Sequence, residues 1–316
     1  YLNSKLNENE KYYIMLDEIQ MLKDFSAVLN ELLHYRNVDV YVTGSNSKFL
    51  STDILTEFRG RGDQIRIHPL SFSEFFSAFE GSKEDAWQEY FTYGGLPLLL
   101  TMKSDEQKIA YLNDLFEMTY IKDIKERNKI RYEAELGELL DILASSTGSL
   151  TNPQKLSNTF KSKRNSGFAE TTITRYCSFL ENAFIISKGS RYDVKGKKYI
   201  STPFKYYFED VGLRNARLNF RQQEITHIME NIIYNELRAR DYMLDVGMVA
   251  SREMRDGKSE YIQYEVDFIA TNGIDKYYIQ SAYALPTEEK REQEFKSLKK
   301  ISDSFSIPNL IRMMIT

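Results

Sequence analysis

The sequence predicts an α/β protein made of several modules, beginning with part of a parallel sheet. Residues 11–16 and residues 38–43 are short apolar runs, and apolar side chains recur at helical spacing between them. A strand, a helix and a strand in this order are typical of a βαβ unit in a doubly wound sheet. Because ligands bind at the carboxyl ends of the strands in such sheets, we expect a site at that edge.

Two acidic residues, Asp17 and Glu18, directly follow the first predicted strand. P-loop ATPases use an Asp here to hold the magnesium shell and a Glu to polarise the attacking water. They also need a phosphate-cradling loop of the form G-x-x-x-x-G-K-[ST], which opens a helix. The one Gly-Lys-Ser of the sequence, residues 257–259, has Arg252 in place of the first glycine and precedes a predicted strand. The sequence therefore contains the hydrolytic edge of an ATPase without its nucleotide cradle.

The composition is that of an ordinary globular protein, with 42% apolar and 28% charged residues among 316. The single cysteine, Cys177, excludes an intramolecular disulfide bond and fits a reducing cytosol. Because no stretch of about 18 apolar residues occurs, we expect a cytoplasmic protein that does not bind membranes. The net charge of −4 argues against coating of nucleic acid by the whole surface, but a local basic face remains compatible with DNA binding.

The chain from residue 64 to residue 127 is predicted to be largely helical. A short strand at residues 64–67 precedes Ser71 and Glu74, whose spacing is that of a capping box at the start of a helix. Residues 84–127 then follow a helical pattern that the turn at residues 94–97 interrupts. We expect this stretch to be a helical lid or connector.

The next stretch is predicted to be a winged helix, made of three helices and a β-hairpin. Apolar stripes mark the first and third helices, and Asn152 followed by Pro153 caps the second. Residues 185–200 should form the hairpin, around a turn at residues 195–197.

Basic residues gather on this hairpin, which suggests contact with double-stranded DNA. The third helix would enter the major groove while the hairpin lysines contact phosphate. The alternative is a solvated hairpin on a domain that only docks onto its neighbours. The candidate DNA-binding residues are Arg175, Lys188, Arg191, Lys195, Lys197 and Lys198.

The C-terminal region has the element order of restriction nucleases. A predicted helix carries Glu230, a strand carries Asp267, and the following strand carries Gln280. Active nucleases of this type hold magnesium with carboxylates and use a nearby Lys to assist the attacking hydroxide. Because Gln280 and Ala282 stand where such an enzyme has Glu-x-Lys, we expect a degenerate nuclease fold used for binding. Metal-dependent cleavage is the alternative.

The chain resembles bacterial and archaeal AAA-like P-loop ATPases that carry a C-terminal winged-helix and PD-(D/E)XK nuclease-like domain. The resemblance runs from about residue 11 to residue 305, and the N-terminal half with the Walker A loop is absent from this chain. The stretches that carry it are YYIMLDEIQ, DVYVTGSNSKFLS, EFRGRGDQIRIHPLSFSEFF, YGGLPLLL, GSLTNPQKLSNTF, KYYFEDVGLRNARLNFRQQE, HIMENIIYNELRAR, EVDFIA and YYIQSAYALP.

The resemblance implies roles for five residues near the N-terminus. Asp17 and Glu18 would be the Walker B pair, with Asp17 holding magnesium through water. Ser45 or Asn46 would be the sensor at the tip of the neighbouring strand. Arg61 would touch the γ-phosphate, in cis or from a neighbouring subunit, and the second case implies a homo-oligomer. ATP and magnesium are thus the expected cofactors of the intact protein, with none bound to this chain alone.

The resemblance also implies four domains. They are the C-terminal half of an AAA-like core (1–80), a helical lid (81–130), a winged helix (131–203) and a nuclease-like domain (204–316). We expect the intact protein to couple ATP hydrolysis to movement of the last two domains on DNA or on a partner protein. The first alternative is a non-enzymatic DNA- or protein-binding module with a vestigial ATPase half, and the second is a metal-dependent nuclease.

Overall fold

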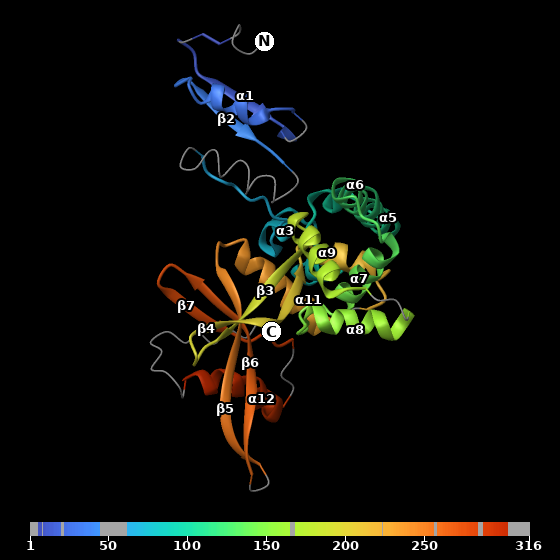
Figure 1. The fold of residues 1–316 in the computed structure, drawn as a ribbon, viewed down its shortest axis with the longest axis vertical. Coiled ribbons are helices and arrows are strands. Elements are labelled where there is room, and N and C mark those ends of the chain that lie inside the picture. Colours follow the sequence, from blue (N-terminus) through green and yellow to red (C-terminus); the bar gives the residue numbers. More distant parts are fainter. Residues whose placement is uncertain are drawn as a thin grey trace. The chain divides into compact units, whose positions relative to one another are not determined.

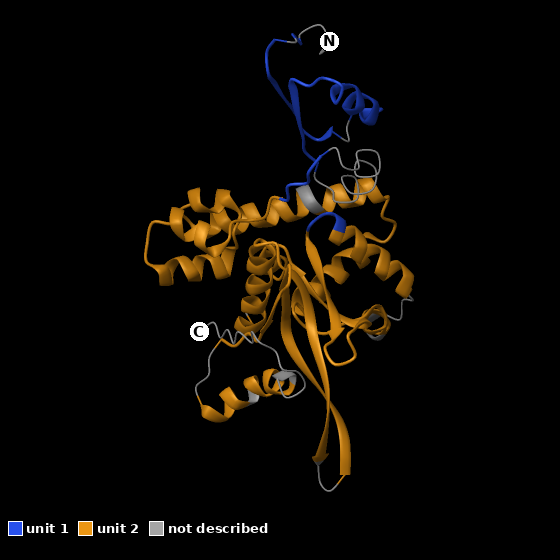
Figure 2. Ribbon diagram, turned by 90° about the vertical axis from the view of Figure 1, so that its left-hand side faces the viewer, with its two compact units in different colours: residues 1–66, 182–184 blue, residues 67–181, 185–316 orange. Residues whose placement is uncertain are grey.

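The computed structural model describes residues 6–302 except residues 8, 20–21, 45–61, 165–167, 223, 256–257 and 284–286. The chain forms two compact units, one of residues 1–66 with 182–184 and one of residues 67–181 with 185–316 (Figure 2). Ser45, Asn46 and Arg61 lie outside the described residues, so their predicted roles in nucleotide contact stay predictions. Among the described residues, no helix combines the length and the apolar character needed to cross a bilayer.

The first unit contains the predicted strand, helix and strand. Strand β1 (Tyr12–Leu16) pairs in parallel with β2 (Val38–Val42), and helix α1 (Phe25–Leu32) connects them (Figure 1). Ile19 and Leu29 are buried between this helix and the apolar side chains of both strands. The parallel pairing brings the carboxyl ends of β1 and β2 to the same edge, as the sequence predicted.

The strand predicted at residues 64–67 does not form. Its apolar side chains are exposed, with Ile65 77% and Ile67 86% accessible. The prediction was wrong because a local apolar alternation makes a strand only where another strand accepts its backbone hydrogen bonds. No strand in the described part of the chain pairs with this segment.

The second unit begins with a run of helices. Ser71 and Glu74 form the predicted capping box at the first of them. Gly94, at a φ of 84°, ends the next helix at the predicted turn. The elements are α3 (Phe72–Ala78), α4 (Lys83–Tyr93), the 3₁₀ helix η4 (Pro97–Thr101), α5 (Asp105–Asp114), the π-helix η5 (Leu115–Ile121) and α6 (Lys122–Asn128).

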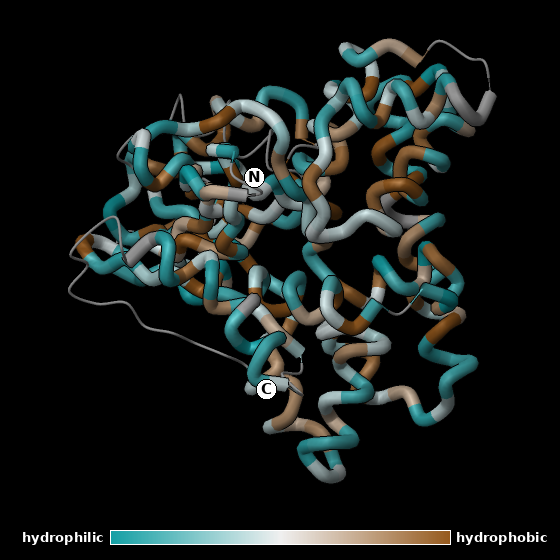
Figure 3. Tube along the Cα trace, turned by 90° about the horizontal axis from the view of Figure 1, so that it is seen from below, coloured by the Kyte–Doolittle hydropathy of each residue, from teal (hydrophilic) through white to brown (hydrophobic). Residues whose placement is uncertain are grey.

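Three more helices and a hairpin follow, as the sequence predicted. Asn152 caps the second helix, since its Oδ1 accepts a hydrogen bond from the Lys155 amide at 2.7 Å. Along the helices in Figure 3, hydrophobic and hydrophilic stretches alternate, as expected for helices with one face in the core. The elements are α7 (Glu133–Ser145), α8 (Pro153–Arg164), α9 (Glu170–Asn182), β3 (Ile186–Asp193) and β4 (Lys198–Phe208).

The hairpin is one edge of a five-stranded sheet with the order β4-β3-β5-β6-β7. Strand β5 (Met243–Arg255), which the sequence pattern did not predict, pairs in parallel with β3, whereas the other neighbours are antiparallel. Helix α11 packs on one face and α12 on the other. The remaining elements are β6 (Lys258–Asn272), β7 (Asp275–Ile279), α10 (Val211–Arg217), α11 (Ile225–Arg238) and α12 (Glu288–Ser302).

Strand β6 has an irregularity next to Asp267. Asp245 of β5 pairs with Ile269, and Gly247 pairs with Val266, so β6 has one extra residue in this interval. Such a β-bulge interrupts the alternation of side chains between the two faces. Val266 and Ile269 consequently both lie in the core on the α12 face, while Phe268 lies in the core on the α11 face.

Candidate functional site

The carboxyl ends of β1 and β2 are tied together by Thr43. Its hydroxyl donates a hydrogen bond to the Asp17 carboxylate and accepts one from the Glu18 amide at 3.1 Å. Its backbone amide donates to the Leu16 carbonyl at 2.9 Å, and its carbonyl accepts from the Ile19 amide at 3.2 Å. Thr43 thus fixes the turn that carries both predicted Walker B residues. Its position at the end of the second apolar run was the only sequence signal for this role.

Asp17 is exposed at this edge, so its carboxylate is accessible to a ligand. Magnesium beside nucleotide phosphates usually keeps several waters and contacts only one or two protein carboxylates. An exposed carboxylate such as that of Asp17 suits this kind of contact. Within the described ranges, no three His, Cys, Asp or Glu side chains come close enough together to hold a metal. The edge therefore presents one exposed carboxylate, and the magnesium role of Asp17 stays a prediction.

A second group of ionisable side chains lies on the α11 side of the five-stranded sheet. The ammonium of Lys205, on β4, is 2.8 Å from Glu230 Oε1 on α11. It is also 2.7 Å from Glu265 Oε1 and 3.7 Å from Asp267 Oδ1, both on β6. We call these four residues the lysine–carboxylate cluster. The structure thus brings the predicted Glu230 and Asp267 together around a lysine that the sequence pattern did not single out.

The remaining hydrogen bonds of the cluster are made within the protein. Tyr207, two residues beyond Lys205 on β4, donates its hydroxyl to Glu230 Oε1 at 2.8 Å. The Ser281 amide donates to Asp267 Oδ2 at 2.8 Å. The alternation of β4 and the bulge in β6 therefore direct these groups toward one point beneath α11.

Burial and charge shift the pKa values of the cluster in a consistent way. Burial alone would lower the pKa of Lys205, but the charges of Glu230, Asp267 and Glu265 outweigh it and raise that pKa. Burial raises the pKa of Asp267 to about 8, and the neighbouring Glu230 adds to the rise. The surrounding carboxylates thus hold Lys205 as a cation.

Gln280, the third predicted residue, lies just beyond β7. Its amide nitrogen donates to Glu294 Oε2 of α12 at 3.4 Å. Its Oε1 is buried and has no hydrogen-bond partner in the described part of the chain. Gln280 is thus directed to α12 by its hydrogen bond, and the cluster takes its third carboxylate from Glu265.

A nuclease-like element order implies a magnesium ion between Glu230 and Asp267, and the cluster does not fit one. Magnesium needs oxygen ligands at about 2.0–2.1 Å in nearly octahedral geometry. The Lys205 ammonium already stands within 2.7–3.7 Å of all three carboxylates. A divalent ion and this ammonium cannot share the same oxygens.

The predicted DNA-binding residues fall into two groups by exposure. Arg175 on α9, Lys188 on β3 and the three lysines at the hairpin turn are exposed; these lysines are Lys195, Lys197 and Lys198. Lys188 Nζ lies 4.0 Å from the centroid of the Phe204 ring. Arg191 is only 5% exposed, so it does not lie on the accessible surface of the hairpin.

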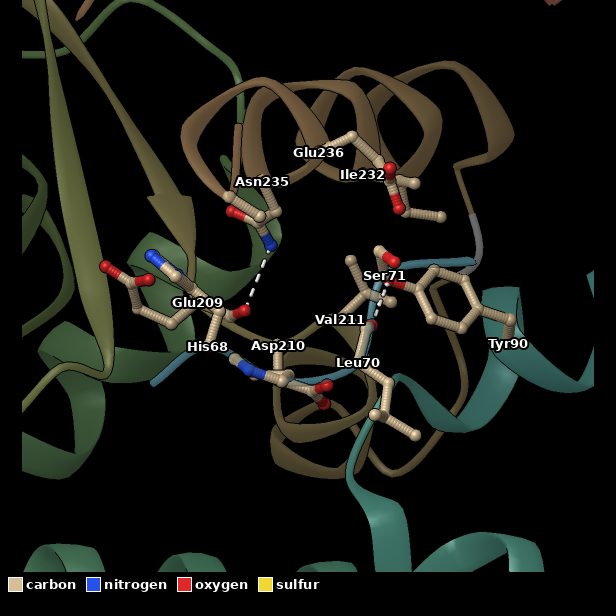
Figure 4. Close-up of a pocket in the computed structure, with 12 residues that line it drawn as sticks. His68, Leu70, Ser71, Tyr90, Glu209, Asp210, Val211, Ile232, Asn235 and Glu236 are labelled. Carbon is tan, nitrogen blue, oxygen red and sulfur yellow. Dashed lines mark hydrogen bonds between the residues drawn. The ribbon is translucent and has the colours of Figure 1, made fainter. Parts of the chain in front are cut away.

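A pocket elsewhere in the second unit surrounds the start of α10. Figure 4 shows Asp210 close to Leu70, with Tyr90 donating to the Leu70 carbonyl at 2.9 Å. Asp210 accepts hydrogen bonds from the Gly95 amide at 2.7 Å and the Leu213 amide at 3.1 Å. Burial raises its pKa to about 6, although these amides oppose the rise. This pocket therefore belongs to the packing of α10 against the turn at residues 94–97.

Comparison with known proteins identifies relatives along most of the chain. Residues 1–76 match the family model of an AAA domain, and residues 84–224 match a domain of unknown function (DUF8612). The chain is 33% identical over 304 residues to an uncharacterized protein of Haemophilus influenzae, covering 95% of the chain and 72% of that protein. It is 27% identical over 315 residues to an uncharacterized protein of Methanocaldococcus jannaschii, covering 96% of the chain and 68% of that protein.

Proposed function

The chain belongs to the family of the uncharacterized Haemophilus influenzae protein, and from this and its AAA match we propose that the intact protein is a magnesium-dependent ATPase. The observation that carries the proposal is the hydrogen bond from Thr43 to Asp17 at the carboxyl edge of β1 and β2. This edge is where parallel α/β sheets bind nucleotides. A threonine that orients the first of two successive acids suits hydrolysis better than packing, since Asp17 is exposed.

In this proposal Asp17 holds magnesium through water and Glu18 polarises the attacking water. The ion, when bound, would neutralise charge that develops on the phosphates. Ser45 or Asn46 would sense the γ-phosphate, and Arg61 would contact it in cis or from a second subunit. The phosphate cradle would come from residues outside this sequence, because the sequence has no complete cradle motif. The two relatives contain residues beyond the part that this chain covers, which is compatible with such a supplement.

Replacement of Glu18 by Gln in the intact polypeptide tests the proposal. The variant should bind ATP normally, whereas turnover should fall by about 100-fold or more because the water loses its general base. The matched control is Asp39→Asn on β2, whose carboxylate pairs with Lys11 at 2.9 Å and should not affect turnover. Equal turnover of the Glu18→Gln variant and the unmodified protein would refute this role.

We propose DNA association as a second function, carried by the three exposed lysines at the β3–β4 turn, Lys195, Lys197 and Lys198. Because these lysines are exposed on a short turn, they can contact phosphates without any rearrangement of buried side chains. ATP hydrolysis would then move this hairpin and the sheet to which it belongs on the duplex. A binding module that uses the same surface without hydrolysis is the alternative, and the Glu18→Gln experiment separates the two.

A further inference from the structure

The Lys205 ammonium has no room to leave the lysine–carboxylate cluster. Lys205 is 3% exposed, and its backbone lies within β4. On one edge of β4, Lys205 pairs with Gly189 of β3. On the other edge, Phe204 forms a bridge with Thr151, and the Tyr206 carbonyl accepts from the Gly148 amide at 3.0 Å. Backbone contacts therefore hold β4 on both of its edges near Lys205. The position of the Lys205 backbone is fixed by these contacts.

The carboxylate oxygens around this ammonium are also engaged. Oε1 of Glu230 accepts from both Lys205 and Tyr207. Oε2 of Glu230 lies under Gly148, where a Cβ atom would be only 3.2 Å from it. Oδ2 of Asp267 accepts from the Ser281 amide, and Oδ1 faces Lys205. A metal ion would therefore have to displace the ammonium and at least one hydrogen bond.

The ammonium of Lys205 provides one positive charge and one N–H donor for each of the three carboxylates of the cluster. An ammonium has three N–H donors, and Glu230, Glu265 and Asp267 offer three carboxylates around it. Because the carboxylates raise its pKa, the amine stays protonated and cannot act as a base toward water. In nucleases with this element order, the lysine lies beside a metal that the carboxylates bind. Here the Lys205 ammonium itself occupies the space between the carboxylates.

From this geometry we propose that Lys205 is a built-in cation that replaces a divalent metal and closes the lysine–carboxylate cluster to metal binding. The cluster then fastens β4, α11 and β6 to one another without a cofactor. With the ammonium between them, the three carboxylates do not form a metal site in the described structure. Removal of the ammonium should let them move toward one another, so that they accept Mn²⁺ or Mg²⁺. This inference concerns a different site from the proposed ATPase edge and does not depend on hydrolysis.

The test measures Mn²⁺ binding and thermal unfolding of the full chain with and without the Lys205→Met substitution. All proteins carry Asp17→Asn, so that metal at the ATPase edge does not contribute. Without Lys205→Met, added Mn²⁺ should neither bind at the cluster nor shift the melting temperature. With it, Mn²⁺ at about 100 times its Kd should raise the melting temperature by about 5 °C or more.

The matched control is Lys108→Met. Lys108 is also buried, but it pairs with the single carboxylate of Glu89 at 2.6 Å. Its removal leaves one acid, which cannot hold a metal, so Mn²⁺ should produce no shift. A Lys205→Met protein that folds and shows no response to Mn²⁺ would overturn the proposal.

A second measurement decides the matter if the Lys205→Met chain does not fold. Manganese binding is then followed by electron paramagnetic resonance in the protein that retains Lys205, with Asp267→Asn as its partner variant. No bound Mn²⁺ supports the closed cluster. One equivalent of bound Mn²⁺ that disappears in Asp267→Asn overturns it, as would Mg²⁺- or Mn²⁺-dependent plasmid nicking that the same substitution abolishes.

Discussion

The backbone of Gly212 lies so close to the carbonyl group of Tyr93 that a Cβ atom at position 212 would overlap the Tyr93 oxygen. Gly212 is in α10, and Tyr93 is the last residue of α4. Nearby, Asn215 Nδ2 donates to the carbonyls of Phe91 at 3.1 Å and Thr92 at 2.9 Å. Helix α10 therefore satisfies carbonyl groups at the end of α4 that the helix itself leaves unpaired. The stretches YGGLPLLL and KYYFEDVGLRNARLNFRQQE, which are far apart in the sequence, thus meet at this contact.

The substitution Gly212→Ala should destabilise the second unit by about 2–3 kcal/mol, because α10 would have to move away from the end of α4. The free energy of unfolding in urea, followed by circular dichroism, measures the effect. The control is Gly137→Ala within α7, where the added Cβ would meet only the flexible end of Arg217 at 3.3 Å. This change should alter the stability by less than about 1 kcal/mol. Equal effects of the two substitutions would contradict the close approach at Gly212.

Asp210 should make the stability of the second unit depend on pH. Its folded pKa of about 6 lies above the ordinary value of 3.8, so the folded state holds the proton more tightly than the unfolded chain. The stabilisation from this proton is present at low pH and is lost as the pH rises through about 6. Between pH 4 and pH 7 the unmodified protein should lose about 2 kcal/mol of stability relative to Asp210→Asn.

Urea titrations of both proteins at several pH values measure this difference. The titration of the other groups is the same in both proteins, so it cancels in the difference of the unfolding free energies. The hydrogen bond that Asn cannot make at this position changes that difference by a constant at every pH. A difference in unfolding free energy that is independent of pH would show that Asp210 is already ionised throughout.

The parts of the fold that the sequence predicted are those with local causes. The βαβ unit follows from apolar spacing, and the caps at Ser71 and Asn152 follow from side chains that bond to backbone amides three residues away. Asp17 and Glu18 could be proposed because they directly follow a strand. Thr43, by contrast, contacts Asp17 only through the parallel pairing of β1 with β2.

The lysine–carboxylate cluster illustrates what the sequence could not provide. Lys205 stands in an aromatic-rich strand, where a lysine commonly points to solvent at an edge. Its burial depends on the pairing of β4 with both β3 and the segment before α8, which is a long-range property. Strand β5 was not predicted because Gly247 and several charged residues obscure its alternation, yet two neighbouring strands hold it in place.

Removal of Lys205 should also have a large cost in stability. The substitution Lys205→Met leaves Glu230 and Asp267 without their counter-ion, and breaking a buried pair in this way commonly costs about 3–5 kcal/mol. The same substitution in a Glu230→Gln, Asp267→Asn background should cost clearly less, because the orphaned charges are gone. A double-mutant cycle from urea titrations without metal measures the coupling. Additive effects would mean that the ammonium and the carboxylates do not interact in solution.

The three hairpin lysines should govern the salt dependence of DNA binding. Replacement of all three by Gln should weaken binding to duplex DNA and reduce the slope of log K against log salt by about 0.9 for each phosphate that is no longer neutralised. Fluorescence anisotropy across a salt series measures this slope. The control replaces three exposed lysines in the helical region, Lys83, Lys103 and Lys122, and so changes the net charge equally. If both triple variants reduce the slope to the same extent, long-range charge and not the hairpin accounts for the binding; if only the hairpin variant does, these lysines contact phosphate.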